Sequence, residues 1–194
     1  MSISVDRTSL SRRLPGDLAM WFFILAELTV FAILILAFAV TQVLHPELFR
    51  ESRAALDSSI GLALTLSLLT SGLLAALAVE QVRLARPQRG ALLLFGALLI
   101  SCVYVVLKLN EYGHLSSLGL GLEHSTFFTL YWILTGFHFL HVLLGLVILG
   151  WMAERCRRRA YSAQDCAGLE SGVLYWHMVD MVWVLLFPLV YVIN

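Results

Sequence analysis

Five long runs of apolar residues divide this chain, and they constrain its fold more than any other feature. The runs lie at residues 18–43, 60–79, 91–109, 127–152 and 173–193. Each is about as long as the ~20 residues that an α-helix needs to cross a hydrocarbon core ~30 Å thick. Because lipid offers the backbone no hydrogen bonds, segments that span it in this way must be helical. We therefore predict an all-α polytopic membrane protein, a bundle of five transmembrane helices.

The composition and the short connecting segments agree with this fold. Only 13% of the 194 residues are charged, whereas soluble domains carry about 25%. The longest predicted connections cover residues 44–59, 110–126 and 153–172. They leave no room for a soluble catalytic domain, so we expect a single membrane domain over residues 1–194.

The distribution of basic residues predicts the orientation of the bundle. Ten arginines fall on one side of the predicted membrane: Arg7, Arg12, Arg13, Arg83, Arg86, Arg89, Arg155, Arg157, Arg158 and Arg159. The other side has only Arg50, Arg53 and Lys108, and Lys108 is expected to snorkel from the end of its helix. By the positive-inside rule, the N-terminus is cytoplasmic and the C-terminus periplasmic. The predicted location is the bacterial inner membrane, crossed several times.

Five acidic or histidine side chains lie inside the predicted helices, where charged groups are costly. They are Glu27, His138, His141, His177 and Asp180. An ionised carboxylate at the centre of a membrane helix costs at least ~2.5 kcal/mol unless it is paired or solvated, and such residues are usually functional. His138 and His141 are three residues apart and share one helix face, and so do His177 and Asp180. All five fall near the predicted midplane, so we hypothesise that they form or border one interhelical polar network.

The sequence leaves alternatives open for these residues. Glu27 is either a proton-responsive group or anchor to a partner, or a protonated acid bonded to another helix. His138 and His141 could ligate a metal, since imidazole is a common ligand for transition metals. A metal site needs three or four ligands, however, and no cysteine completes the set. We therefore expect no metal in this chain, and histidines that donate to carbonyls or carboxylates on neighbouring helices.

Five other residues in or next to the predicted helices lead to expectations about helix packing. Gly136 and Gly145 are expected to allow close helix contact. Lys108 and Glu111 are expected to form an interfacial salt bridge of small net value. Pro188 should kink the last helix, because proline lacks a backbone N–H.

Arg155 has two interpretations. It is either a topology signal attracted to anionic lipid, worth about 1 kcal/mol per charge, or part of a specific phospholipid site, since a guanidinium matches phosphate geometry.

Two segments together resemble subunit III of the haem–copper oxidase superfamily. They are Thr135–Val142, which reads TGFHFLHV, and Tyr175–Trp183, which reads YWHMVDMVW. The resemblance runs from about residue 14 to 194, and Glu27, Glu111 and Glu170 also fall where the family has glutamates. Larger members have two more N-terminal helices. The chain therefore resembles the short five-helix form of quinol oxidases and of accessory proteins encoded with nitric oxide reductases.

The resemblance implies a non-catalytic accessory subunit of a respiratory haem–copper oxidoreductase complex. Such a subunit carries no catalytic residue and no haem or copper of its own, packs against catalytic subunit I and other subunits, and has no nucleic-acid partner. It binds phospholipid and supports stability and proton uptake during electron transport. Arg155, Glu170 and Trp176 are the candidate lipid-binding residues. The sequence leaves open whether the complex reduces oxygen or nitric oxide, and its five-helix length favours the nitric oxide reductase group.

Two functions of other classes compete with this one. A stand-alone membrane metalloprotein would use His138, His141 and His177. A proton-coupled transporter would use Glu27, but we find no inverted repeat and no pair of broken helices in the sequence.

Overall fold

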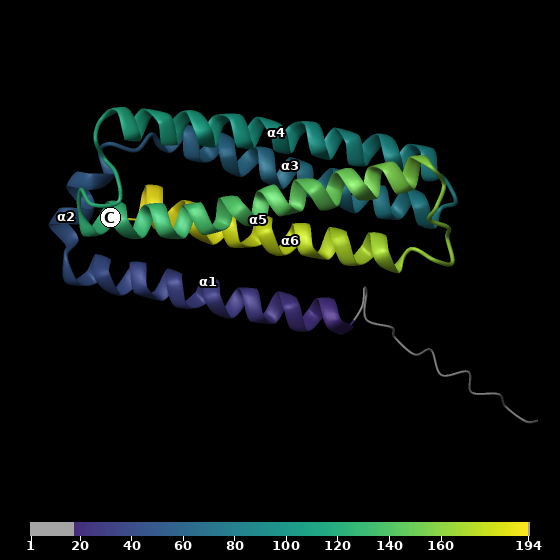
Figure 1. The fold of residues 1–194 in the computed structure, drawn as a ribbon, viewed down its shortest axis with the longest axis horizontal. Helices are drawn as coiled ribbons and strands as arrows, with labels where there is room; N and C mark the ends of the chain where they lie inside the picture. The colour runs from purple at the N-terminus through teal and green to yellow at the C-terminus, as the bar shows by residue number, and fades with distance from the viewer. Residues whose placement is uncertain (1–17, 194) are drawn as a thin grey trace, which may run out of the picture.

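The computed structural model describes residues 18–193, and helices make up most of that range (Figure 1). The helices are α1 (Leu18–Leu44), α2 (Pro46–Arg53), α3 (Ser58–Arg83), α4 (Pro87–Ser117), α5 (Thr126–Arg157) and α6 (Ala167–Phe187), followed by the π-helical turn η1 (Pro188–Val192). The N-terminal arginines Arg7, Arg12 and Arg13 lie outside the described residues. The predicted orientation of the termini therefore stays a prediction.

Five helices are long and apolar enough to cross a membrane, as predicted. They are longer than the apolar runs, because polar residues at the membrane surface extend them: the run at 91–109 lies within the 31 residues of α4. The short helix α2 falls in a segment that we expected to be a loop. It starts with Pro46 in its first turn, where proline is favourable, and it buries Phe49 and Arg53.

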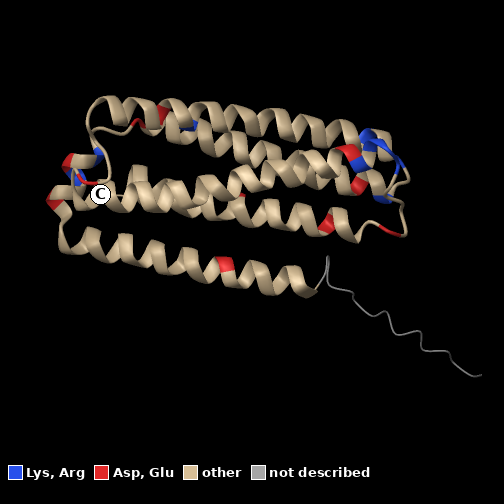
Figure 2. Cartoon of the chain, in the orientation of Figure 1, with Lys and Arg blue, Asp and Glu red and all other residues tan. Residues whose placement is uncertain are grey.

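The long helices form an antiparallel bundle with α1 at one side (Figure 1). Helix α3 packs against α4 and α6, α5 packs against α4 and α6, and α1 contacts α5 and α6. Helix α1 buries Phe31 and Phe38 against the bundle, whereas Leu25, Ile33 and Leu36 are exposed. These exposed apolar side chains are compatible with lipid contact. Charged residues gather mainly at the two ends of the bundle (Figure 2).

Local signals set several helix ends. The Asp57 carboxylate accepts a hydrogen bond from the Ser59 backbone N–H at 2.8 Å, and that bond lowers the pKa of Asp57. Ser125 caps α5 through the backbone N–H of Phe128 at 3.4 Å. Helix α4 ends at Ser117, and Gly119 follows its C-cap with a φ of 73°, a left-handed conformation that glycine adopts readily.

We expected Gly136 and Gly145 at close helix contacts, and only Gly145 lies at such a contact. A Cβ on Gly145 would collide with the Trp176 ring, so this glycine lets α5 and α6 approach. Gly136 has open space around it, and the expectation was wrong there. The reason is the helix face, since Gly136 points away from its neighbours.

Pro188 changes the last helix from α to π geometry over residues 188–192. Proline has no N–H to continue the α-helical ladder, so carbonyls near this turn need other partners. Arg53 donates to the Val190 carbonyl at 3.0 Å and to the Leu189 carbonyl at 2.9 Å. Ser58 donates to the Tyr191 carbonyl at 3.2 Å. Burial lowers the pKa of Arg53, but arginine remains charged in proteins, so α2 caps the end of the chain with a buried cation.

Replacing this cap should destabilise the fold. Arg53→Met would leave two buried carbonyls without their donor, and we expect a loss of about 2 kcal/mol in unfolding free energy. Arg50→Met, on the same helix, removes an arginine that is largely exposed along with its partner Glu47, and should change stability by less than about 0.5 kcal/mol. Thermal unfolding of the full chain in detergent measures both. Equal stability of the two variants would contradict the capping role.

Candidate functional site

Glu27 and His141 form a polar contact between α1 and α5. Nε2 of His141 lies 3.0 Å from Oε2 of Glu27, and Nδ1 of His141 lies 2.9 Å from the Phe137 carbonyl oxygen. The Phe31 ring packs against the same imidazole at 5.1 Å between centroids. This contact links the peripheral helix α1 to the bundle, in addition to the apolar packing of α1.

The chemistry of this contact fixes how many protons it holds. A carbonyl oxygen can only accept, so Nδ1 of His141 carries a hydrogen. A hydrogen bond between Nε2 and Oε2 then needs one more proton, on either the imidazole or the carboxyl group. Written as imidazolium and carboxylate or as imidazole and carboxylic acid, the pair has zero net charge. That neutrality is what a membrane interior requires.

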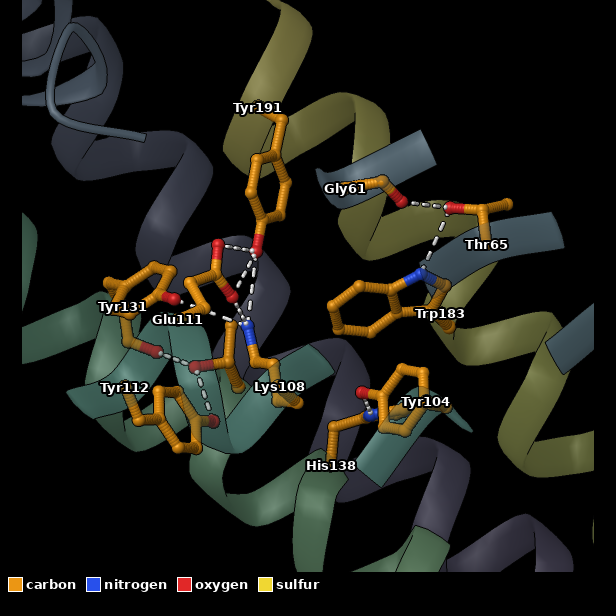
Figure 3. A network of polar contacts seen from close by, with 11 residues as sticks. Gly61, Thr65, Tyr104, Lys108, Glu111, Tyr112, Tyr131, His138, Trp183 and Tyr191 are labelled. Atoms are coloured by element: carbon orange, nitrogen blue, oxygen red, sulfur yellow. Dashed lines mark hydrogen bonds and ion pairs between the residues drawn. The ribbon is translucent and has the colours of Figure 1, made fainter. Parts of the chain in front are cut away.

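His138 forms a separate contact within the bundle. Its Nε2 lies 3.1 Å from the Val179 carbonyl of α6, and its Nδ1 lies 3.2 Å from the Tyr104 hydroxyl of α4. Because the carbonyl accepts, Nε2 carries the hydrogen and Nδ1 accepts from Tyr104. Both nitrogens of this fully buried ring are thus used to join three helices. Figure 3 shows the contact with Tyr104.

His177 and Asp180 form a third contact on α6. Nδ1 of His177 lies 3.0 Å from Oδ2 of Asp180. The Asp180 side chain is 5% exposed, and it packs on Gly72 of α3, where a Cβ would collide with it. The His177 side chain is 39% exposed. Within residues 18–193, the five predicted residues therefore make three separate contacts, and no hydrogen bond links the three.

A fourth polar cluster, around Lys108, is also buried. Lys108 is fully buried, and its Nζ donates to Glu111 at 2.6 Å, to the Tyr191 hydroxyl at 3.0 Å and to the Tyr131 hydroxyl at 3.1 Å (Figure 3). Tyr191 also donates to Glu111 at 2.7 Å. Four aromatic rings lie within 5.7 Å of the ammonium: Tyr112, Tyr131, Trp183 and Tyr191.

The expectation that Lys108 snorkels to the surface was wrong. Its predicted salt bridge with Glu111 is confirmed, but this pair is buried in the bundle and is not interfacial. Snorkelling requires a side chain at the lipid surface, but α4 continues to Ser117 and turns Lys108 towards α5 and α6. The aromatic faces and hydroxyls stabilise the buried ammonium. The spacing of Tyr104, Lys108 and Glu111 at i, i+4 and i+7 puts them on one face of α4, and this is the sequence signal that could have found the cluster.

The three predicted lipid-binding residues lie in different surroundings. The exposed Arg155 guanidinium lies 5.0 Å from the Trp151 ring centroid and 5.3 Å from that of Tyr161. Glu170 accepts from Arg83 at 2.7 Å and from the Cys166 thiol at 3.0 Å. Burial and this carboxylate raise the pKa of Cys166. Trp176 is fully buried against Gly145, and its indole nitrogen has no hydrogen-bond partner in the described chain.

A groove of about 810 Å³ lies between α1, α5 and α6. Its walls are mainly apolar and include Met20, Phe23, Leu144 and Tyr175. It lies at the end of the bundle where α1 and α6 begin, which is also the end where α5 reaches Arg155.

No group of three or more His, Cys, Asp or Glu side chains that could hold a metal occurs among residues 18–193.

Comparisons with known proteins agree on one family. The model of the family described as cytochrome c oxidase subunit III matches residues 14–194. Cytochrome c oxidase subunit 3 of Thermostichus vulcanus is 38% identical over 79 residues, which are 40% of this chain and 39% of that protein. Quinol oxidase subunit 3 of Bacillus spizizenii is 28% identical over 183 residues, covering 91% of this chain and 86% of that protein. Probable quinol oxidase subunit 3 of Staphylococcus aureus is 27% identical over 179 residues, which cover 92% of this chain and 89% of that protein. The match thus spans about two fifths of the first relative and most of the other two.

The buried Lys108 should be stable only with its partner. Lys108→Met would leave Glu111 as an uncompensated buried acid, at a cost of about 3–5 kcal/mol. Adding Glu111→Leu removes that acid, and replacing both ions by apolar groups is often neutral, so the double variant should regain most of the loss. Thermal unfolding of the full chain in detergent compares the two. A double variant less stable than the single one would show that the charges are not coupled.

Proposed function

This chain belongs to the cytochrome c oxidase subunit III family, since the family's model matches residues 14–194, and on this basis we propose that it is a non-catalytic accessory subunit that packs against the catalytic subunit of a haem–copper oxidase. It is a multi-pass membrane protein of a family whose members are subunits of oxidase complexes. Beyond membership of this family, we propose the accessory role, the catalytic subunit as partner and a location in the bacterial inner membrane.

The observation that carries the packing proposal is the outward nitrogen of His177. Nδ1 is bonded to Asp180, and Nε2 has no partner among the residues that the structure describes. Met181 and Leu185, one and two turns further along α6, are also exposed and are apolar. A hydrogen-bonding group on an otherwise apolar membrane face favours contact with protein over contact with lipid. We therefore propose that this face of α6 meets a helix of catalytic subunit I.

The groove between α1, α5 and α6 suits a phospholipid. Its apolar walls fit acyl chains, and Arg155 lies at the same end of the bundle, where a headgroup would be. Of the other two candidates, Glu170 is engaged by Arg83, and Trp176 is buried behind the surface. We propose Arg155 as the headgroup contact, with the other two shaping α6 beside the groove.

We propose oxygen as the substrate of the complex. The relatives described above are named as subunits of cytochrome c oxidase or quinol oxidase, which supports oxygen over the nitric oxide that chain length alone favoured. The haem and copper would belong to the catalytic subunit. In this chain both nitrogens of His138 and of His141 already take part in hydrogen bonds. Its contribution to electron transport would then be structural support and help with proton uptake.

Purification of the tagged chain from its native membrane in mild detergent tests the proposal. We expect it to elute with a large haem-containing subunit, identified by mass and by absorption spectrum, and the material to consume oxygen. Nitric oxide consumption without oxygen consumption would move the chain to the reductase group. A colourless chain that elutes alone, even in native lipid, would contradict the accessory role.

The same purification tests the His177 surface through a matched pair of variants. His177→Asn keeps a donor near the position of Nδ1 for Asp180 but removes Nε2, and should lower the amount of co-eluting partner. Met181→Leu changes an exposed neighbour without changing hydrogen bonding, and should leave that amount unchanged. Full recovery of the partner with His177→Asn would remove this face from the proposed interface.

Glu27 should affect the durability of the complex. Glu27→Ala leaves Nε2 of His141 without a partner, which we expect to weaken the anchoring of α1 by about 1–2 kcal/mol, a factor of roughly 5–30. Membrane insertion should be intact, while the oxidase loses activity after fewer turnovers. Glu27→Gln can still donate to Nε2 and should behave more like the wild type. If the alanine variant assembled and turned over like the wild type, Glu27 would have no functional role.

A further inference from the structure

Three arginines line one cavity at the arginine-rich end of the bundle, away from the apolar groove. Arg86 and Arg89 come from the start of α4 and Arg159 from the turn after α5, and the cavity has a volume of about 430 Å³. Figure 2 shows basic residues concentrated at this end. We propose that this arginine cavity binds a phosphoryl group, the headgroup of an anionic phospholipid or a soluble phosphate.

The residues that the structure describes do not neutralise the charges of the cavity. Three other arginines at the same end do have acidic partners: Arg83 pairs with Glu170, and Arg157 and Arg158 pair with Glu154. Within residues 18–193, Arg86, Arg89 and Arg159 have no ion pair, and no acidic residue lines the cavity. Three uncompensated positive charges around one cavity favour binding of an anion.

The walls of the cavity are held in place by two helix-ending turns. In each, the residue after the C-cap is left-handed although it is not glycine: Ala85 has a φ of 57° and Arg159 a φ of 55°. The Arg86 N–H bonds to the Gln81 carbonyl at 2.8 Å, and the Ala160 N–H to the Arg155 carbonyl at 2.9 Å. These are the bonds of Schellman motifs. A left-handed conformation costs a non-glycine residue about 1–2 kcal/mol, so the fold holds both turns against a local preference.

Contacts across the cavity fix the two turns relative to each other. The Cys156 thiol donates to the Pro87 carbonyl at 3.1 Å, and the Gln88 amide donates to the Arg157 carbonyl at 3.3 Å. Gly90 packs closely on Val82, which brings α4 against α3 directly below the cavity. The guanidinium-bearing segments are therefore part of a rigid corner of the bundle, unlike charges on a loose loop.

The guanidinium groups that line the cavity suit a phosphate ligand. Guanidinium groups bind phosphate oxygens in a bidentate geometry, and the cavity lies at the first turn of α4, where the helix dipole favours an anion. Leu84 and Leu92 beside it are exposed, so acyl chains attached to the phosphate would find apolar contacts. This placement favours a lipid headgroup as the source, and it does not depend on the proposed role in an oxidase.

Native mass spectrometry of the full chain in an uncharged detergent tests the site. The probes are phosphatidylglycerol, phosphatidylcholine and inorganic pyrophosphate, each added alone. We expect retained phosphatidylglycerol at least about tenfold above phosphatidylcholine, which is electrically neutral. Retention of pyrophosphate as well would show that the phosphoryl group is sufficient, whereas its absence would assign the site to lipid. If the chain retained none of the three probes, the proposal would be overturned.

Two double variants separate a site from general attraction to basic residues. Arg86→Gln/Arg159→Gln removes two charges from the cavity and should abolish most of the selective retention. Arg157→Gln/Arg158→Gln removes two charges from the same end but outside the cavity, and should change retention less than twofold if the site is specific. Equal losses in both variants would show a diffuse electrostatic effect and overturn the site.

Discussion

The lack of hydrogen-bonding partners in lipid is the constraint on which the rest of this structure depends. Inside the membrane a polar side chain must find its partner within the protein, and the described helices show this repeatedly. His138 uses both nitrogens to join α4, α5 and α6. Glu27 and His141 share a proton between α1 and α5. Arg53 supplies the donors that a proline turn leaves missing. The polar residues thus act as specific links between helices whose apolar faces have little preference for one another.

The cluster around Lys108 shows how strong this requirement is. A lysine that is 0% exposed and a glutamate that is 5% exposed lie together in the bundle. Two tyrosine hydroxyls and the faces of nearby aromatic rings surround the ammonium. The cluster joins α4, α5 and the end of α6, so a small shift of any of these helices would break several contacts. It gives the bundle one arrangement at a point where apolar packing alone would allow several.

Two outward-facing features have no polar partner within the described chain. The first is the outer nitrogen of His177 on the partly exposed face of α6, and the second is the arginine cavity of Arg86, Arg89 and Arg159 at one end of the bundle. The first suits a helix of a partner subunit and the second a phosphoryl group. The accessory role that we propose requires such surfaces, because a subunit of that kind would act through contacts.

The sequence by itself determined the five spanning helices, since apolar length and the absence of water leave no other fold. It also determined the family, through the segments around His138 and Asp180, and the pairing of His177 with Asp180 follows from their separation along one helix. Contacts between helices were decided only by the tertiary structure. Helix periodicity places Lys108 on a face but does not say that this face turns inward, so its burial was missed. For the same reason one interhelical network was predicted where the bundle holds separate contacts, since depth in the membrane is encoded in sequence position and direction around the bundle is not.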